Sequence, residues 1–478
     1  MDAAPPHNPA DFRRVMVGLG LAMLLSALDQ TIVAPAMPTI GVDLGDPQNL
    51  PWIVTAYLIT ATVVTPLYGK VADVHGRRIT LLVALTIFIL GSVACAVAPT
   101  MATLSLARAL QGMGGGGLIS LAQTVIADLV SPRERGRYQT YFATVFITSS
   151  VAGPALGGFF AQYLHWSLIF WINLPLGLAA LLTVNSRLKR LPEQRHPHQI
   201  DYLGAGLLIF ASGLLVLALG WAGPRVGWLA PLTFGLLAAS ALFWLFFARH
   251  VRRAEEPLIP LRILGLRLVS DAIVSSSLGL GGFVGLSVVM PIYYESVAHL
   301  NARDSGLVLI PLMAATVAGA TLSGRMMARV GHYKIVAVAG LGVGSLAALA
   351  AAWRVDSLSL TALNALLTLV TFGIGTMLPI ATVSVQNAVD PRDLGTATAA
   401  MQFFRQLGCA TLAALFGALA LGGGRAERVE EAILSPDSAD SVASMFRLVF
   451  LLLAVTNALS FLFMARMEER ALRGERHH

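Results

Sequence analysis

Charged residues are scarce in this sequence. Asp, Glu, Lys and Arg make up 12% of the 478 residues, whereas hydrophobic residues make up 56% and glycine occupies a further 45 positions. Soluble domains contain about 25% charged residues, so this chain has too little polar surface to coat a water-soluble globule of its size. Its mean hydropathy of +0.72 instead indicates a protein whose solvent is the bilayer. No room is left for a soluble catalytic domain.

Other missing features exclude energy sources and cofactors. The three lysines, Lys70, Lys189 and Lys334, do not belong to a G-x-x-x-x-G-K-[ST] motif, so the chain has no phosphate loop for ATP. Cys95 and Cys409 lie far apart and the ten histidines form no H-E-x-x-H motif, so we expect no disulfide, metal or cofactor. We find no pairing of a nucleophile with a base and predict no enzyme. The net charge is +7, and the basic residues lie in short loops between apolar runs. This placement is typical of residues that set the orientation of a membrane protein, and it disfavours nucleic-acid binding.

Long apolar runs recur along the chain and predict an all-α integral membrane protein with fourteen spans. The first run, at about 15–40, follows two arginines as a signal peptide does, but it is too long for a cleaved signal and contains Asp29. The other predicted spans lie at about 50–69, 79–98, 103–128, 138–162, 167–186, 202–222, 228–248, 268–294, 305–327, 334–353, 358–386, 394–421 and 444–466.

An even number of spans places both termini on one side of the membrane. About 25 of the 33 Lys and Arg residues then share the side of the termini, about six lie opposite, and Arg108 and Arg405 lie within spans. Because positive loops face the cytoplasm, we expect both termini there, in a multi-pass protein of the bacterial-type cytoplasmic (inner) membrane.

A weak repeat divides the chain into halves. The segment GKVADVHGRR (69–78) is similar to GRMMARVGHYK (324–334), with two glycines seven residues apart in each. The repeat predicts two six-helix bundles, at 1–200 and 251–478, with a two-helix hairpin inserted at 201–250. The second copy is degenerate, since Ala328 occupies the place of Asp73.

Asp29 is the sharpest signal in the sequence. A carboxylate within a span is expensive and tends to mark a proton or ion pathway. Asp29 lies about 15 residues beyond Arg14, or roughly 22 Å along a helix, near or beyond mid-membrane. Arg108, in the predicted span 103–128, is a candidate partner, and movement between the two helices would then switch proton affinity. The alternatives are a carboxylate merely neutralised by a basic neighbour and an arginine that serves structure or reaches the interface.

Small residues mark close helix contacts in two spans. Gly112 and Gly114–Gly117 lie in one, and the segment from Ser149 to Gly158 lies in the next. Packing alone explains much of this pattern. The more specific element is a proline surrounded by glycines, which suits a seam where helices rock against each other. Its members are Gly153, Pro154, Gly157 and Gly158.

The loop GKVADVHGRR is short, polar and tightly spaced. Gly69 and Gly76 permit tight turns, Asp73 suits a helix N-terminus, and Arg77 suits a carboxylate such as Asp128 at the end of the span 103–128. The alternative is a solvated basic loop that only obeys the orientation rule.

Three further charges fall in or near later spans. Arg405 lies about ten residues into the span 394–421 and needs an anion or carbonyl groups, so it lines a central cavity or anchors a polar network. Asp271 and Glu295 lie near opposite ends of the span 268–294, where we expect solvation at the membrane interface.

These motifs together resemble the major facilitator superfamily, and within it the fourteen-helix drug:proton antiporters of the EmrB/QacA type. LDQTIVAPAMPTI (28–40) is similar to that branch's first-helix motif, and GKVADVHGRR to the superfamily's signature loop. RALQGMG (108–114) is similar to the fourth-helix arginine motif, the proline–glycine segment to the fifth-helix antiporter motif, and WSLIFWINLPLG (166–177) to the sixth-helix signature. Two residues depart from the pattern: Ser149 replaces a usual glycine, and Glu295 replaces a frequent glutamine. The second departure bears on which substrate charge is tolerated and makes Glu295, like Arg405, a candidate cavity or substrate residue.

The resemblance implies a transporter that exports lipophilic, cationic drugs by alternating access in exchange for protons. It implies that Asp29 and Arg108 serve proton coupling, that Asp73 and Arg77 join the halves on the cytoplasmic side, and that Gly153 and Pro154 limit leakage. The expected partners are protons, small lipophilic substrates and the bilayer, and a periplasmic adaptor is left open. An exporter of a lipid, siderophore or metabolite with the same fold is the alternative.

Overall fold

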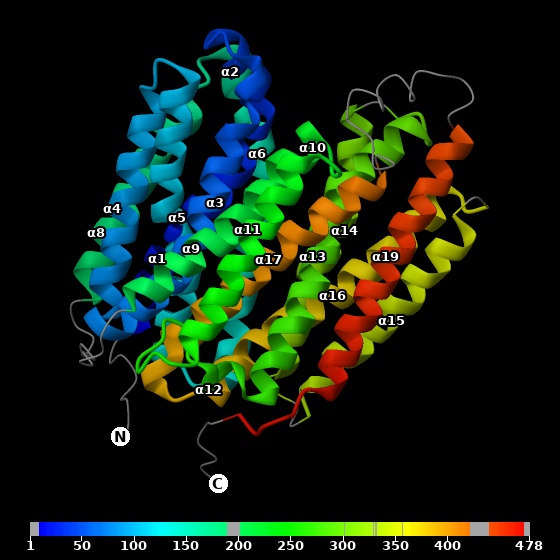
Figure 1. Ribbon diagram of the computed structural model, residues 1–478. Coiled ribbons are helices and arrows are strands. Elements are labelled where there is room, and N and C mark those ends of the chain that lie inside the picture. The colour runs from blue at the N-terminus through cyan, green and yellow to red at the C-terminus, as the bar shows by residue number, and fades with distance from the viewer. Residues whose placement is uncertain are drawn as a thin grey trace.

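The computed structural model describes residues 9–188, 201–300, 302–327, 329, 332–355, 357–420 and 439–472, and every regular element within them is a helix (Figure 1). Lys189, Ala328 and the predicted boundary at residue 200 lie outside the described residues.

The first group of helices ends at Leu188. Capping residues define several of its boundaries: α5 follows Thr100, whose hydroxyl accepts a hydrogen bond from the Thr103 N–H, and α3 ends where Gly76 adopts a φ of +92°. The members are α1 (Pro9–Ile32), η1 (Ala34–Ala36), α2 (Met37–Asp43), η2 (Pro47–Asn49), α3 (Pro51–His75), α4 (Arg77–Ala96), α5 (Met101–Leu129), α6 (Pro132–Tyr163), α7 (Leu168–Trp171) and α8 (Asn173–Leu188).

A helical hairpin and a second group follow. The hairpin contains α9 (Tyr202–Leu217), the π-helical turn η3 (Ala218–Ala222), α10 (Gly223–Val226) and α11 (Pro231–Val251). The second group contains α12 (Leu261–Leu264), α13 (Arg267–Ser296), α14 (Ala302–Met327), α15 (Lys334–Arg354), α16 (Leu360–Ala388), η4 (Pro391–Asp393), α17 (Leu394–Ala420) and α19 (Ala439–Arg466).

Each predicted span coincides with a long helix in the described residues. Thirteen of these helices are long and apolar enough to cross a membrane. The other, α5, has 29 residues, but its middle is rich in glycine and it carries Arg108, Gln111 and Gln123. The prediction of an all-helical membrane protein is therefore confirmed.

The sequence predicts two spans as continuous helices that are interrupted in the structure. The span at 15–40 breaks after Ile32, because Pro35 and Pro38 have no N–H to continue the ladder, and η1 and α2 follow. The span at 167–186 is divided into α7 and α8, and Pro175 lies in the first turn of α8, where its missing N–H is tolerated.

The two groups have separate hydrophobic cores. In the first, α3 and α4 pack on α5, while α1 packs on α6 and α8. In the second, α13 packs on α17, and α16 packs on α14 and α15. Figure 1 shows α1–α8 on one side and α13–α19 on the other. The hairpin lies at the junction, since side chains of α9 and α11 pack with Phe403 of α17 and Leu67 of α3.

The molecule has two distinct ends. Helix α1 begins and α19 finishes at one end, which also carries Gly76 and is called the Gly76 end, whereas α2 and α10 lie at the other, called the α2 end (Figure 1). At the Gly76 end the two groups meet chiefly along two helix pairs, α3 with α17 and α6 with α14, and α5 and α16 add smaller contacts with α17 and α6.

Candidate functional site

Asp29 lies near the end of α1 and is completely buried, with an exposed fraction of 0%. Its Oδ2 accepts a hydrogen bond from Arg108 Nη1 at 2.6 Å, and its Oδ1 accepts one from Gln111 Nε2 at 2.8 Å. The structure therefore brings Asp29 and Arg108 together as a desolvated ion pair between α1 and α5. This proximity is compatible with both interpretations of Asp29, as a proton carrier and as a neutralised carboxylate.

Arg108 is held by neighbours on two helices. Its Nε donates to the Ile53 carbonyl of α3 at 3.0 Å, and Nη1 also donates to Gln111 Oε1 at 2.7 Å. The guanidinium carbon lies 4.4 Å from the centre of the Tyr57 ring, a cation–π distance. Because the charge is shared among these groups, the guanidinium has a fixed position from which to bind or release Asp29.

A second set of polar side chains surrounds the pair. Ser92 Oγ on α4 accepts hydrogen bonds from Gln111 at 3.2 Å and from Asn173 at 3.0 Å, and it donates to the Phe170 carbonyl at 2.9 Å. These contacts join α4, α5, α7 and α8 around Asp29. The sequence interpretation did not assign Gln111 or Asn173 a role, although both lie inside motifs it quoted; Ser92 carried no signal.

The glycines of α6 bring that helix onto α1 just beyond Asp29. A Cβ at Gly153 would overlap the Thr31 hydroxyl, and one at Gly157 would overlap the Ile32 carbonyl oxygen. Thr31 Oγ1 donates to the Ser149 carbonyl at 2.8 Å. Hence α6 and α1 are in direct contact here, and a displacement of α1 would displace α6.

The other two residues of the motif do not share this contact. Pro154 is exposed on α6, and among the described residues no atom of another segment lies within 4 Å of a Cβ built at Gly158. Only Gly153 and Gly157 of the four thus make the close helix approach.

At the Gly76 end, Asp73 of α3 binds the first turn of α17. Its Oδ1 accepts from the Gly395 N–H at 3.1 Å, and its Oδ2 accepts from the Thr396 N–H at 2.7 Å and hydroxyl at 2.6 Å. The first turn of a helix leaves N–H groups without partners and carries a partial positive charge, so a carboxylate is stabilising there. Asp73 thereby connects the two groups of helices.

The other residues of the signature loop support Asp73. Arg77 forms an ion pair with Asp73, and its Nε donates to Asp128 Oδ2 at 3.0 Å. Gly69 permits the approach of α3 and α17, because a Cβ there would overlap that of Ala399. The structure thus brings Gly69, Asp73, Gly76, Arg77 and Asp128 to one place. Their partner on α17 was not predicted, since nothing in its local sequence marks it.

The repeat-related loop makes the second contact between the groups. Gly136 of α6 lies against the Gly324 carbonyl and Met327 of α14, where an added Cβ would be 2.9 Å from the Gly324 oxygen. Lys334 does not bridge the groups: its Nζ donates to the Ala465 and Met467 carbonyls, both at 2.7 Å, at the end of α19. Backbone proximity replaces the carboxylate contact that Asp73 provides in the first copy.

Residues 19–202 and 200–413 match the family model described as Major Facilitator Superfamily. The chain belongs to this superfamily. Its many long apolar helices make it a multi-pass membrane protein.

Known members of the superfamily are similar to most of this chain. An uncharacterized MFS-type transporter of Mycobacterium tuberculosis (strain ATCC 25618 / H37Rv) is 35% identical over 416 residues, which are 87% of this chain and 60% of the relative. Multidrug resistance protein 3 of Bacillus subtilis (strain 168) is 32% identical over 410 residues, 85% of this chain and 79% of that protein. The chain thus spans 60% of the length of the mycobacterial relative.

A solved structure supports the fold. The proton:xylose symporter XylE, bound to 6-bromo-6-deoxy-D-glucose, superposes with a TM-score of 0.63 over 96% of each chain, at 16% identity. At this identity the similarity concerns the fold alone.

Three charges in the second half of this major facilitator protein differ in environment. Arg405 of α17 is 8% exposed and donates from Nη2 to Thr382 Oγ1 of α16 at 3.2 Å. Glu295 is exposed near the end of α13. Asp271 was expected to be solvated, and that expectation is wrong: it is 1% exposed and pairs with Arg466 Nη2 at 3.2 Å, because α19 packs over α13 and covers it.

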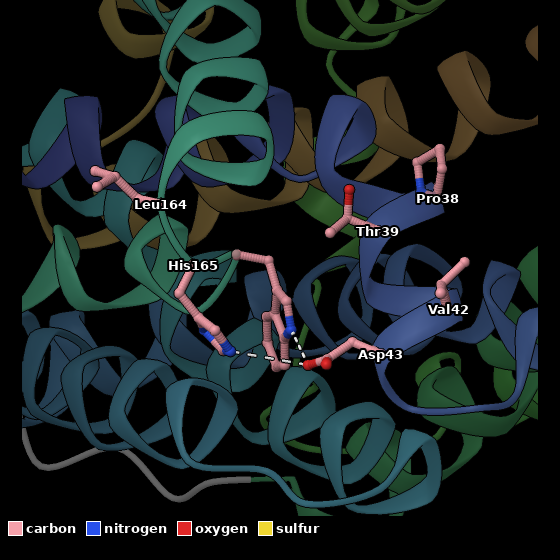
Figure 2. Close-up of a pocket in the computed structure, with 7 residues that line it drawn as sticks. Pro38, Thr39, Val42, Asp43, Leu164 and His165 are labelled. Carbon is pink, nitrogen blue, oxygen red and sulfur yellow. Dashed lines mark hydrogen bonds and ion pairs between the residues drawn. The ribbon is translucent and has the colours of Figure 1, made fainter.

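A surface pocket lies at the α2 end (Figure 2). Asp43 faces it from α2, and its Oδ2 accepts a hydrogen bond from Trp166 Nε1 at 2.6 Å and lies 3.8 Å from His165 Nε2. None of the predicted site residues lines this pocket. Because the pocket opens widely and Asp43 already has these partners, it is a junction between α2 and the segment that links α6 to α7, and not an enclosed binding site.

Proposed function

We propose that this protein is a proton-coupled exporter of lipophilic compounds that works by alternating access. The observation that carries the proposal is the buried pair of Asp29 and Arg108, with 2.6 Å between Oδ2 and Nη1. A carboxylate buried within a membrane span is expensive and tends to mark an ion or proton pathway. The multidrug-resistance name of the Bacillus subtilis relative supports export of drug-like compounds.

Protonation of Asp29 would weaken its attraction for Arg108. A neutral carboxyl group keeps a hydrogen bond but loses the charge attraction, so the proton favours an arrangement in which α1 and α5 separate. Because Thr31 and Gly153 lie in contact, a displacement of α1 moves α6 as well.

Helix α6 extends the effect to the Gly76 end. It has 32 residues, and Gly136 lies 17 residues before Gly153, which is about 26 Å at 1.5 Å per residue. The same helix therefore contacts α1 near Asp29 and α14 at Gly324. This supports coupling between proton binding and closure of the Gly76 end.

The contact of Asp73 with α17 would hold one state of the cycle. These hydrogen bonds exist only while the two groups meet at the Gly76 end, so they stabilise the state that is closed there. Proton and substrate then drive export by their different affinities for the two states.

We assign the chain to the fourteen-helix drug:proton antiporter branch, with rocking units at residues 1–200 and 251–478 and an inserted hairpin at 201–250. The Gly76 end is assigned to the cytoplasm, with both termini there, because Arg77, Lys334 and Arg466 lie at that end and positive residues face inward. Its membrane is then the bacterial cytoplasmic membrane. The role is transport and not catalysis.

The substrates are proposed to be lipophilic, because apolar contact is non-directional and tolerates varied shapes. The expectation that they are cations comes from the resemblance to drug:proton antiporters, and Asp29 is a buried carboxylate that would attract a cation. In the arrangement described here that carboxylate is already bound by Arg108 and Gln111, so a cationic substrate requires its release.

The test uses inverted membrane vesicles with an imposed pH gradient. Uptake of ethidium and of an uncharged lipophilic dye is measured for the parent, for Asp29→Asn and for Arg354→Gln, which removes an exposed charge at the end of α15. We expect gradient-driven uptake in the parent and in Arg354→Gln, and none in Asp29→Asn. Gradient-driven uptake at the parental rate in Asp29→Asn would contradict the proposed role of Asp29.

A further inference from the structure

Buried charges in the described residues are paired with an opposite charge or with backbone carbonyl groups, and Arg405 differs from the others. The three buried carboxylates, Asp29, Asp73 and Asp271, pair with Arg108, Arg77 and Arg466. Among the buried cations, Lys70 lies 3.9 Å from Glu256, and Arg135 donates to the Ala127 and Val130 carbonyls. In the part of the chain that the structure describes, Arg405 pairs with no carboxylate.

Among the described residues, the guanidinium of Arg405 has a single hydrogen-bond partner, which is neutral. Nη2 donates to the Thr382 hydroxyl at 3.2 Å, while Nε is buried with no acceptor in the described residues. The side-chain oxygen of the adjacent Gln406 is also buried with no partner there. An arginine stays charged in a protein, and a desolvated charge without a counter-ion is strongly unfavourable. The polar network considered from the sequence therefore consists of one hydroxyl, which does not neutralise the charge.

We propose that Arg405 receives the acidic group of an amphipathic compound that the protein transports. A carboxylate, sulfonate or phosphate would supply the missing charge and accept hydrogen bonds from the guanidinium in the paired geometry that arginine favours. This inference rests on the proposed export function and names its substrate class.

The position of Arg405 suits such a role. It lies on α17, which packs on α13 of its own group and on α3 and α5 of the other, so the residue is carried by a helix at the junction. Thr396, the partner of Asp73, lies nine residues earlier on α17, about 13 Å along the axis. An anion bound at Arg405 would therefore act on the same helix that closes the Gly76 end.

The charge balance also selects among substrates. Asp29 and Arg108 cancel each other, whereas Arg405 contributes an unbalanced positive charge to the interior. Acidic and zwitterionic amphiphiles are then favoured over compounds that carry only a positive charge.

Equilibrium binding gives the direct test. The probes are three dansyl-labelled alkyl chains of equal length that end in a carboxylate, a methyl ester or a trimethylammonium group, titrated into the full-length protein in detergent. We expect the parent to bind the carboxylate chain at least about tenfold more tightly than the ester. Arg405→Gln should lose that preference and bind the ester as the parent does, while Arg354→Gln behaves as the parent. Equal affinity for the carboxylate and the ester in the parent, or an unchanged carboxylate preference in Arg405→Gln, overturns the proposal.

Arg405→Lys provides a second test in case the Arg405→Gln variant does not fold. Lysine keeps the charge but cannot make the paired hydrogen bonds of a guanidinium, so we expect a carboxylate preference between those of the parent and Arg405→Gln. If Arg405→Gln does not fold, the parent and Arg405→Lys decide the matter: a carboxylate preference in Arg405→Lys as large as that of the parent overturns the proposal.

A competition arm separates a transported acid from a membrane lipid, which offers the same phosphate chemistry. Displacement of the carboxylate probe by unlabelled alkyl carboxylate, and weakly by phosphatidylglycerol, supports substrate recognition. Displacement by phosphatidylglycerol alone assigns the site to a lipid headgroup and overturns it.

Transport distinguishes this inference from the export function. If the parent moves the ester and ammonium chains under a pH gradient but Arg405→Gln changes nothing for the carboxylate, the inference fails and export stands. If no probe responds to the gradient, proton-driven export fails, and the binding experiment still decides whether Arg405 recognises an acid.

Discussion

Asp73 on α3 accepts hydrogen bonds from both the backbone N–H and the hydroxyl of Thr396 on α17, at 2.7 and 2.6 Å. The two residues lie 323 positions apart in the chain. A single buried carboxylate thus caps a helix of the opposite group and joins the halves of the protein. Since the same carboxylate pairs with Arg77, the strength of the closure depends on α3, α4 and α17 together.

Asp73→Asn should open the Gly76 end. The substitution removes the charge from the acceptor of three hydrogen bonds, and a single bond to a charged group is worth about 1.5–3 kcal/mol. Loss of one such bond already moves the equilibrium between closed and open states by tenfold or more, at roughly 1.4 kcal/mol per factor of ten. Spin labels at Glu134 on α6 and Arg325 on α14, both exposed, report the separation by pulsed resonance distance measurement. We expect a longer distance population in the variant.

Two variants calibrate that result. Thr396→Val removes only the hydroxyl bond and should give a smaller shift of about 1 kcal/mol. Glu468→Gln removes an exposed carboxylate near the end of α19 that pairs with Arg470 and should leave the distances unchanged. If Asp73→Asn has the distance distribution of the parent, the closing role of Asp73 is wrong.

Arg108→Ala should destabilise the protein more than Asp29→Asn does. Either substitution leaves the other member of the buried pair without its counter-charge, which costs about 3–5 kcal/mol. Arg108→Ala also removes the hydrogen bonds to the Ile53 carbonyl and Gln111 and the contact with the Tyr57 ring, whereas Asn keeps the shape of Asp29. Thermal unfolding in detergent measures the difference. The double variant Asp29→Asn/Arg108→Gln, which removes both charges, should recover much of the loss, and a purely additive loss would contradict the coupling between the two residues.

The sequence predicted the helices well because their signals are local. Apolar runs of sufficient length and basic loops are properties of neighbouring residues, and each predicted span corresponds to a long helix among the described residues. The breaks after Ile32 and before Asn173 were missed, although Pro35, Pro38 and Pro175 are local signals as well. Prolines interrupt some membrane helices and are accommodated within others, such as Pro66 within α3, so the residue alone does not decide.

The polar partners were less predictable because they depend on packing. Asp29 and Arg108 were identified by the cost of charge in a membrane, and their proximity follows from the structure. Thr396 could not be identified as the partner of Asp73, since a threonine at the start of a helix is common. Asp271 was expected to be solvated, because its position near a span end suggested the interface, but α19 covers it.

Gly157 lies against the backbone of α1 and Gly158 does not, so the two glycines provide a test of the contact between α6 and α1. Gly157→Ala places a Cβ against the Ile32 carbonyl, a backbone atom that cannot rotate away, whereas Gly158→Ala meets open space among the described residues. We expect Gly157→Ala to separate α1 from α6, lower thermal stability by about 1–3 kcal/mol, and increase proton leakage through reconstituted vesicles without substrate. A pH-sensitive dye inside the vesicles measures that leakage, and Gly158→Ala is the matched control. Equal leakage in both variants would show that the contact with α1 does not limit proton flow.

Glu295→Gln tests whether an exposed acid near the end of α13 contributes to substrate choice. If Glu295 offers a departing cation a transient partner near bulk water, its removal should slow transport of ethidium more than that of an uncharged dye, while proton coupling through Asp29 persists. If Glu295 lies only in the headgroup layer, salt screening leaves its interactions worth little, at about 0–1 kcal/mol. Because the side chain is exposed, and because Arg405 rather than an acid is the uncompensated buried charge of the described residues, we expect both dyes to move at parental rates. A selective loss of ethidium transport would contradict this expectation and would identify a cation-binding position at the α2 end.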